Sequence, residues 1–194
     1  MRILSGKLKG SKLLTNQLKI KSSKNFITRP TSVRVKETLF NIIQHAFNID
    51  FHQISFLDCF SGSGAIGLEA ISRGSSVVSF LDNDRFSCRC IIKNLNNLRL
   101  YENNNGRSFS VINKDFFDKS LIFNNTFDVV FMDPPYDLVT FREVFMRLSE
   151  LRVTNKDSLI IYESNRELEG IEIFETLKSK KIGKTYLTFF KMLN

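Results

Sequence analysis

The feature that most constrains the fold of this chain is an apolar segment that runs into a glycine-rich loop and then into a helical pattern. Residues 54–60 have the composition of a short buried strand, and Gly62, Gly64 and Gly67 follow in a G-x-G-x-x-G arrangement. Residues 65–73 continue with helical spacing. Glycines at such a turn allow a tight bend and a close approach of the backbone to a ligand. The segment therefore predicts an α/β fold with a ligand site at the end of a strand.

The rest of the chain repeats this alternation of strands and helices. Apolar periodicity predicts helices over 33–47, 65–73, 85–98 and 140–151, and strands over 54–60, 77–82, 109–112, 127–133 and 159–162. Two further β-like runs, 171–178 and 184–193, flank Lys180 to Gly183 and suggest a closing hairpin. Strands that alternate with helices favour a mostly parallel, Rossmann-like sheet covered on both faces.

Composition limits the setting in which such a fold would act. The chain has 194 residues, 42% of them hydrophobic and 25% charged, which fits one domain with a real core. No apolar run is long enough to span a membrane, and we expect no secretory leader because the first residues lack the apolar run of a secretory signal. The three cysteines and two histidines have no zinc-site spacing, so we expect reduced thiols, no metal and a cytoplasmic location.

Positive charge is concentrated at the start of the chain. Residues 1–36 hold ten of the 28 Lys and Arg residues and none of the 20 Asp and Glu residues. A segregated basic segment favours a polyanionic partner, and nucleic acid is preferred here over a membrane surface or a disordered arm. We therefore expect a basic RNA-binding hairpin or arm over 1–30, with Lys7, Lys9 and Lys12 on RNA, and a second domain over 31–194.

Acidic residues lie at the ends of the first two predicted strands of that domain. Asp58 could pair with a ligand ammonium group, and Asp82 lies about 20 residues beyond the glycine loop, where an acid meets ribose hydroxyls. Asp84 is better explained as a helix cap, which is also the alternative for Asp82. The loop residues Ser61, Gly62 and Gly64 complete this candidate cofactor site, although the loop alone suits NAD as well as S-adenosylmethionine and could be a structural turn.

A third acid follows the third predicted strand. Asp115 could accept a hydrogen bond from an adenine amine, with Phe116 beside the ring; the alternative is an Asp that caps a turn. Three successive strands that each lead to an Asp would form one nucleoside site, because ligands of open α/β sheets bind at the carboxyl edge.

The most specific motif is Asp133-Pro134-Pro135-Tyr136, directly after the fourth predicted strand. Two prolines fix the backbone and remove two donors. The Asp133 carboxylate and the Pro134 carbonyl can then both accept hydrogen bonds from one exocyclic amine, which turns its lone pair toward the methyl group of S-adenosylmethionine. Tyr136 offers a face on which a base can stack. The alternative is a strand-terminating turn with an incidental aromatic residue.

Taken together, these segments resemble the RsmD family of bacterial 16S rRNA guanine-N2 methyltransferases over nearly the whole chain. The resemblance lies in residues 1–10, 29–40, 58–70 and 133–136. The glycine loop and the Pro-Pro motif are shared by many amino-methyltransferases, and the segment that begins Arg29-Pro30-Thr31 narrows the family.

The resemblance implies a class I S-adenosylmethionine-dependent methyltransferase with a seven-stranded sheet. It implies that Asp133, Pro134 and Pro135 form the clamp for the guanine amine, with Tyr136 on the base, Asp82 on the ribose and Asp115 on the adenine. It also implies that Arg29 and Arg34 lie near the target strand, although both could simply anchor the arm. Where the family often has Glu, this chain has the shorter Asp82.

Two other functions remain open from the sequence. An adenine-N6 methyltransferase acting on DNA or RNA would use the same motif, and a nucleotide-binding or RNA-binding protein would lack catalysis. An NAD dehydrogenase is disfavoured by the Pro-Pro motif and by the absence of a substrate domain. The expected partner is small-subunit rRNA or an assembling 30S particle, bound by a monomer.

Overall fold

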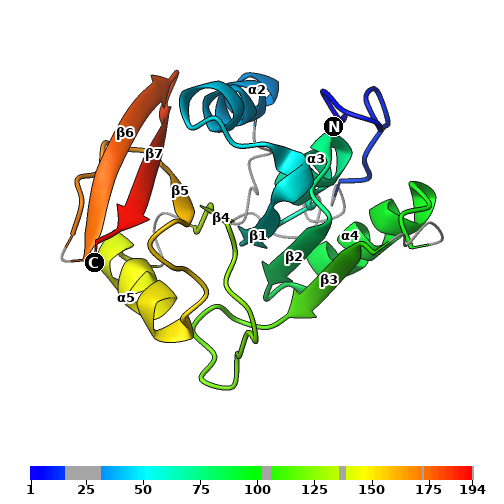
Figure 1. Cartoon of the computed structure of the whole chain (residues 1–194). Helices are drawn as coiled ribbons and strands as arrows, with labels where there is room; N and C mark the ends of the chain where they lie inside the picture. Colours follow the sequence, from blue (N-terminus) through cyan, green and yellow to red (C-terminus); the bar gives the residue numbers. More distant parts are fainter. Residues whose placement is uncertain (16–31, 102–105, 136–138, 172, 194) are drawn as a thin grey trace.

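The computed structural model describes residues 1–15, 32–101, 106–135, 139–171 and 173–193. At its centre is a seven-stranded sheet in the order β3-β2-β1-β4-β5-β7-β6 (Figure 1). Strands β1 to β5 pair in parallel, and β7 pairs antiparallel with both β5 and β6. The strands are β1 Ser55–Cys59, β2 Val77–Asp82, β3 Ser108–Asn113, β4 Val129–Met132, β5 Leu159–Ser164, β6 Phe174–Ile182 and β7 Thr185–Met192. The predicted mostly parallel, Rossmann-like sheet is confirmed.

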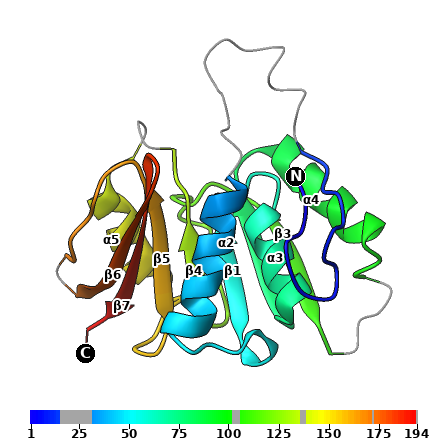
Figure 2. The same cartoon turned by 90° about the horizontal axis from the view of Figure 1, so that it is seen from above.

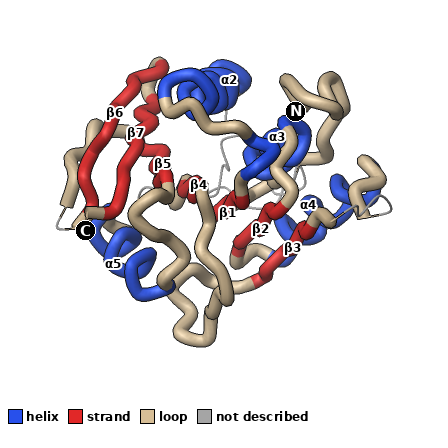
Figure 3. Tube along the Cα trace, viewed as in Figure 1, coloured by secondary structure: helices blue, strands red, loops and turns tan. Residues whose placement is uncertain are grey.

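Helices cover both faces of this sheet (Figure 3). They are α2 Val33–Asn41, α3 Ala65–Arg73, α4 Arg85–Asn97 and α5 Phe141–Leu151. The predicted helix over 33–47 is continuous in space, but its second part, η1 Ile42–Ala46, is a π-helical turn. A short 3-10 turn, η2 Phe51–Gln53, leads into β1.

The alternation of side chains along the strands divides the core into two apolar clusters. In β4, Val129 and Phe131 belong to the cluster beneath α2, α3 and α4, whereas Val130 and Met132 belong to the cluster beneath α5. Successive side chains of a strand point to opposite faces of the sheet. A strand that is covered on both faces therefore carries apolar residues at successive positions, without the alternation of apolar and polar residues seen in half-exposed strands. This is why the continuous apolar runs of the sequence correctly indicated central parallel strands.

The closing hairpin differs from its prediction. We expected β-like runs over 171–178 and 184–193 with Lys180 to Gly183 between them. Instead β6 extends to Ile182, and Lys180 and Lys181 are strand residues paired with Leu187 and Tyr186. The reason is that β6 is an edge strand with an exposed side, where lysines are tolerated and common.

Residues 1–15 form a hairpin that packs on α3 and α4 (Figure 2). Ile3 N–H donates to the Ser11 carbonyl at 3.0 Å, and Gly10 N–H donates back to the Ile3 carbonyl at 2.9 Å. The hairpin form expected for the start of the chain is thus observed, while 16–30 lies outside the described residues. In the part of the chain that the structure describes, no helix is both long and apolar enough to cross a membrane.

Candidate active site

The carboxyl edge of the sheet brings three of the predicted acids to one side. Asp58 lies opposite Phe80 of β2 and Phe131 of β4 in the parallel register. Asp82 lies two residues after Phe80, and Asp133 lies two residues after Phe131. Because side chains two residues apart point to the same face, all three acids belong to the face that α2, α3 and α4 cover. The strand ends therefore place an acidic row next to the start of α3.

The glycine loop connects β1 to α3 and is held between two strands. The Ser61 hydroxyl donates to the carbonyls of Asp58 at 2.5 Å and Leu81 at 3.1 Å. Gly62 adopts a φ of +53°, and a Cβ there would meet no atom within 4 Å, so the loop is open on that side. At Gly67 a Cβ would lie 2.3 Å from the Phe80 ring, so glycine is needed for the helix to approach the sheet.

Asp58 is a carboxylate in the interior, only 1% exposed. Gly67 N–H donates to its Oδ2 at 2.9 Å. Burial raises the pKa of Asp58 well above its usual value; the Gly67 hydrogen bond opposes this effect, and the charges of Asp82 and Asp133 add to it. An acid in this position would be stabilised in its charged form by a cation, and a ligand ammonium or sulfonium group provides one.

Asp82 joins the glycine loop to the start of α4. Its Oδ2 accepts from Gly62 N–H at 2.7 Å and its Oδ1 from Asp84 N–H at 2.8 Å. Asp84 in turn caps α4 by accepting from Ser87 N–H at 3.0 Å, which confirms the cap expected there. A carboxylate has about four acceptor positions. Asp82 accepts from two backbone N–H groups and can therefore also accept hydrogen bonds from the two hydroxyls of a ribose.

Asp115 and Phe116 meet the same edge but differ in exposure. Asp115 is exposed; it accepts from the Asn83 side chain at 3.0 Å and from Phe117 N–H at 2.8 Å, the second of which caps a turn. The Phe116 ring is 3% exposed and packs 5.1 Å from the Phe60 ring in the cluster beneath α5. Asp115 can therefore face a ligand directly, whereas Phe116 contributes to the floor below it.

The predicted clamp directly follows β4. Part of Asp133 reaches solvent, Pro134 is buried and Pro135 is exposed, while Tyr136 lies outside the described residues. Burial raises the pKa of Asp133 to about 7. The neighbouring Tyr162 of β5 is 4% exposed, and its pKa is raised by burial and, to a smaller extent, by the charge of Asp133. The Asp133 carboxylate thus stands at a densely packed strand end.

The structure adds an acid that sequence analysis did not single out. Glu163 near the end of β5 is 6% exposed. It pairs with Leu187, a member of the cluster beneath α2, α3 and α4. Because Met132 pairs with Tyr162, the register continues to Asp133 beside Glu163. The signal was present in the sequence: Glu163, like Asp58 and Asp82, lies near the end of an apolar strand.

The predicted RNA-binding residues do not gather at one place. Lys7, Lys9 and Lys12 are exposed, but Lys7 N–H donates to the Ser72 carbonyl at the far end of α3 from the glycine loop. Nine residues of helix separate these points by roughly 13 Å. Arg34 is exposed in the first turn of α2, which starts at the carboxyl edge of the sheet (Figure 2). Arg29 lies outside the described residues.

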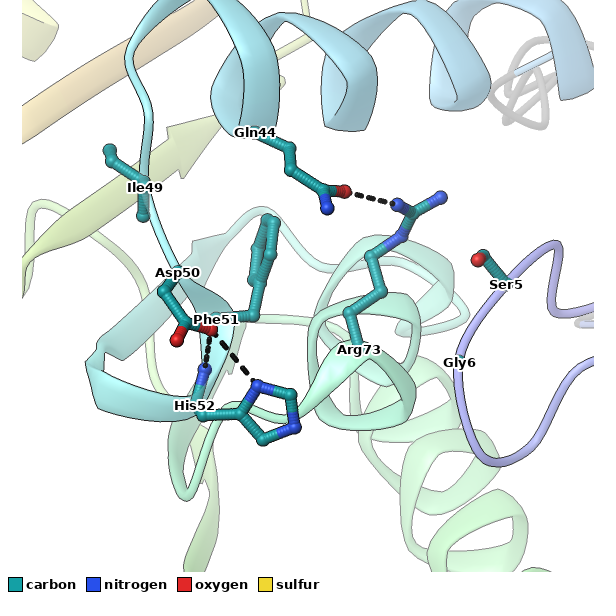
Figure 4. A pocket seen from close by; sticks show the side chains of 8 residues that line it. All are labelled: Ser5, Gly6, Gln44, Ile49, Asp50, Phe51, His52 and Arg73. Carbon is teal, nitrogen blue, oxygen red and sulfur yellow. Dashed lines mark hydrogen bonds and ion pairs between the residues drawn. The ribbon is translucent and has the colours of Figure 1, made fainter.

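A cavity of about 150 Å³ lies at the opposite edge of the sheet, between the N-terminal hairpin and the segment that leads into β1 (Figure 4). Asp50 and His52 from that segment interact at 2.9 Å, and Arg73 at the end of α3 donates to Gln44 at 3.5 Å. These residues precede β1 or end α3, so the cavity is separate from the acidic row. The hydrogen bonds between its lining side chains join Asp50 to His52 and α3 to η1.

The chain is similar to known proteins over nearly its whole length. A family model described as "Conserved hypothetical protein 95" matches residues 1–191. The chain is 34% identical to "Ribosomal RNA small subunit methyltransferase D" of Haemophilus influenzae, covering 94% of this chain and 89% of that protein. It is 33% identical to the protein of the same name in Escherichia coli, covering 86% and 76%. The solved structure titled "Putative methyltransferase yhhF" from Escherichia coli is 28% identical, with a TM-score of 0.76 and coverage of 100% and 98%.

Proposed function

Because the chain belongs to this family, the RsmD family, we propose that it transfers a methyl group from S-adenosylmethionine to the exocyclic N2 of a guanine in 16S rRNA. The observation that carries the proposal is the position of Asp133, a carboxylate at a proline-fixed strand end, next to the strand of Asp58 and on the same face of the sheet as Asp58 and Asp82. Relatives named as small-subunit rRNA methyltransferases match most of the chain. Their names favour rRNA over the adenine-N6 alternative and over a protein without catalysis.

The residues at the carboxyl edge fit S-adenosylmethionine. This ligand is cationic at its ammonium and sulfonium groups, and the edge holds Asp58, whose pKa is raised in part by two other acids. Asp82 is suited to the ribose and the exposed Asp115 to the adenine amine. Gly62 leaves open space on the loop between them. When bound, S-adenosylmethionine supplies an electrophilic methyl group.

Asp133 and Pro134 orient the substrate amine. The Asp133 carboxylate and the Pro134 carbonyl accept one hydrogen each from the guanine –NH₂ group, which directs the nitrogen lone pair away from the clamp. As the nitrogen acquires positive charge during attack, the charged Asp133 stabilises it in a site where burial strengthens the interaction. Tyr136 stacks on the base. The methylated nitrogen loses its proton after the attack, so no general base is required.

We extend the proposal to the partner and its setting. The substrate is small-subunit RNA, free or within an assembling 30S particle, and the protein acts as a monomer in the cytoplasm, where this RNA is assembled. The basic segment 1–30 contacts RNA phosphates through Lys7, Lys9 and Lys12, and Arg29 and Arg34 lie near the target strand. Flipped or unpaired guanine enters the clamp, because a base in a duplex cannot present its amine to a strand-end site.

The substitution Asp133→Ala separates catalysis from binding. We expect the variant to bind S-adenosylmethionine and RNA with affinities close to those of the wild type and to lose at least a hundredfold in methyl transfer. Calorimetry with S-adenosylmethionine and with NADH tests the cofactor. Binding of NADH alone, or full transfer by the Asp133→Ala variant, would contradict the proposal.

A further inference from the structure

The β6–β7 hairpin carries a concentration of positive charge that the sequence analysis attributed only to the N-terminal segment. Residues 178–186 contain Lys178, Lys180, Lys181 and Lys184 and no acid. All four lysines are exposed. In the described part of the chain none of them forms an ion pair, whereas Lys191 at the other end of the same hairpin lies 3.2 Å from Glu175. The unbalanced charge is therefore confined to the tip.

The register places this tip at the edge that bears the acidic row. Ser164 at the end of β5 pairs with Tyr186, and Ile182 pairs with Thr185 across the turn. The turn therefore extends beyond the carboxyl end of β5, the strand next to β4 and Asp133. At a spacing of about 4.8 Å between neighbouring strands, β7 and β6 lie roughly 10 and 14 Å from β4.

The tip is also held firmly in place. Gly183 adopts a φ of +64° at the turn, and the buried Ile182 anchors the end of β6 in the core beneath α2. Lys181 Nζ lies 5.2 Å from the centre of the Tyr186 ring on the neighbouring strand. A lysine beside a partly exposed aromatic ring, on a rigid element, is the combination that single-stranded nucleic acids bind through phosphates and base stacking.

We propose that the β6–β7 tip binds the phosphates of the RNA strand beside the target nucleotide, with Lys180, Lys181 and Lys184 as the contacts. This proposal rests on the proposed function for the identity of the partner. It differs from the expectation that the N-terminal lysines carry RNA binding, because Lys7 is held near the opposite edge by its bond to Ser72. The turn of the N-terminal hairpin at Lys7 then contacts RNA remote from the reaction, and the β6–β7 tip contacts RNA next to the reaction.

The test compares two double variants of the whole protein on unmodified 16S rRNA made by transcription. Lys180→Ala/Lys184→Ala removes charge from the tip. Lys156→Ala/Lys191→Ala removes the same charge at the opposite edge, where Lys156 is exposed and Lys191 is half-buried beside Glu175. We expect the tip variant to bind RNA about tenfold more weakly. The slope of the logarithm of the binding constant against the logarithm of the salt concentration should fall in magnitude by about 1.4, because two phosphate contacts are lost. The control should change neither value by much, and Arg at the two tip positions should restore binding.

Two further measurements separate this proposal from the proposed function. Binding of S-adenosylmethionine and the rate at saturating RNA should be unchanged in the tip variant, because neither lysine lies in the clamp. An RNA affinity and salt slope equal to those of the control variant would overturn the proposal. If the wild type binds RNA through the tip but transfers no methyl group, the tip proposal is supported while the proposed function fails.

Discussion

The Nζ of Lys36 lies 2.9 Å from Oε2 of Glu69, and both side chains are almost completely buried. Burial lowers the pKa of Lys36, an effect that the hydrogen bond and charge of Glu69 oppose. Glu69 also accepts from the N–H groups of Leu4 and Ser5 at 2.8 and 2.9 Å. One carboxylate of α3 thus joins α2 and the N-terminal hairpin, and the hairpin is an integral part of the fold rather than a loose arm.

Replacing Glu69 should therefore be costly. In Glu69→Gln the Lys36 ammonium stays buried without a charged partner, and we expect a loss of about 3–5 kcal/mol in the free energy of unfolding. Urea denaturation measures this loss. The matched control is Glu150→Gln, which removes an exposed partner of Arg147 and should cost less than about 1 kcal/mol. Similar costs for the two variants would show that the buried pair does not hold the hairpin.

Gly62 in the loop and Gly67 in the first turn of α3 should respond differently to alanine. Gly67→Ala forces a Cβ against Phe80, and we expect a net loss of about 1–3 kcal/mol in stability despite the better helix propensity of alanine. Gly62→Ala meets no atom, so only its positive φ opposes folding, by about 1 kcal/mol. Because that side of the loop faces the proposed nucleoside, we expect Gly62→Ala to weaken S-adenosylmethionine binding in calorimetry. Unchanged affinity in Gly62→Ala would place the nucleoside elsewhere.

The raised pKa of Asp133 predicts a pH dependence. The clamp needs the carboxylate form as acceptor, so kcat/KM should rise with pH through about 7 and then level off. Asp133→Asn keeps a carbonyl acceptor but cannot titrate. The variant enzyme should therefore be slower, and its kcat/KM should not rise with pH through about 7. A flat wild-type profile between pH 6 and 8 would contradict the assignment.

The Asp133 carboxyl group should lower the stability of the fold as the pH rises, over the range in which it raises the activity. Because the folded pKa of Asp133 lies above its unfolded value, the folded state binds more protons between about pH 4 and 7. Its contribution to stability is therefore present at low pH and is lost as the pH rises through 7. Denaturation midpoints of Asp133→Asn should fall less over this range than those of the wild type.

The strand ends were the part of the site that the sequence could predict. Asp58 and Asp82 lie at the ends of apolar strands, and Asp133 directly follows one. Parallel strands place their carboxyl ends at one edge, so the local pattern was enough to bring these acids together. The cap at Asp84 was predictable for the same reason, since its signal is local in the chain.

Contacts between distant segments were not predictable in this way. Glu69 lies within an apolar helix, and nothing in its neighbours indicates that Leu4 and Lys36 meet it. Likewise, Lys180 and Lys181 appeared to form a turn because lysines disfavour a central strand, and only the edge position of β6 explains their place. Charge counted along the sequence therefore did not single out the exposed lysines of the β6–β7 tip.

The most direct test of the account is the nucleoside made in the reaction. Unmodified small subunits and free 16S rRNA are incubated with the wild-type protein and S-adenosylmethionine labelled in its methyl group, and the RNA is then digested to nucleosides. The account predicts that the label appears in N2-methylguanosine. Label in N6-methyladenosine, or no label in either RNA, would contradict it.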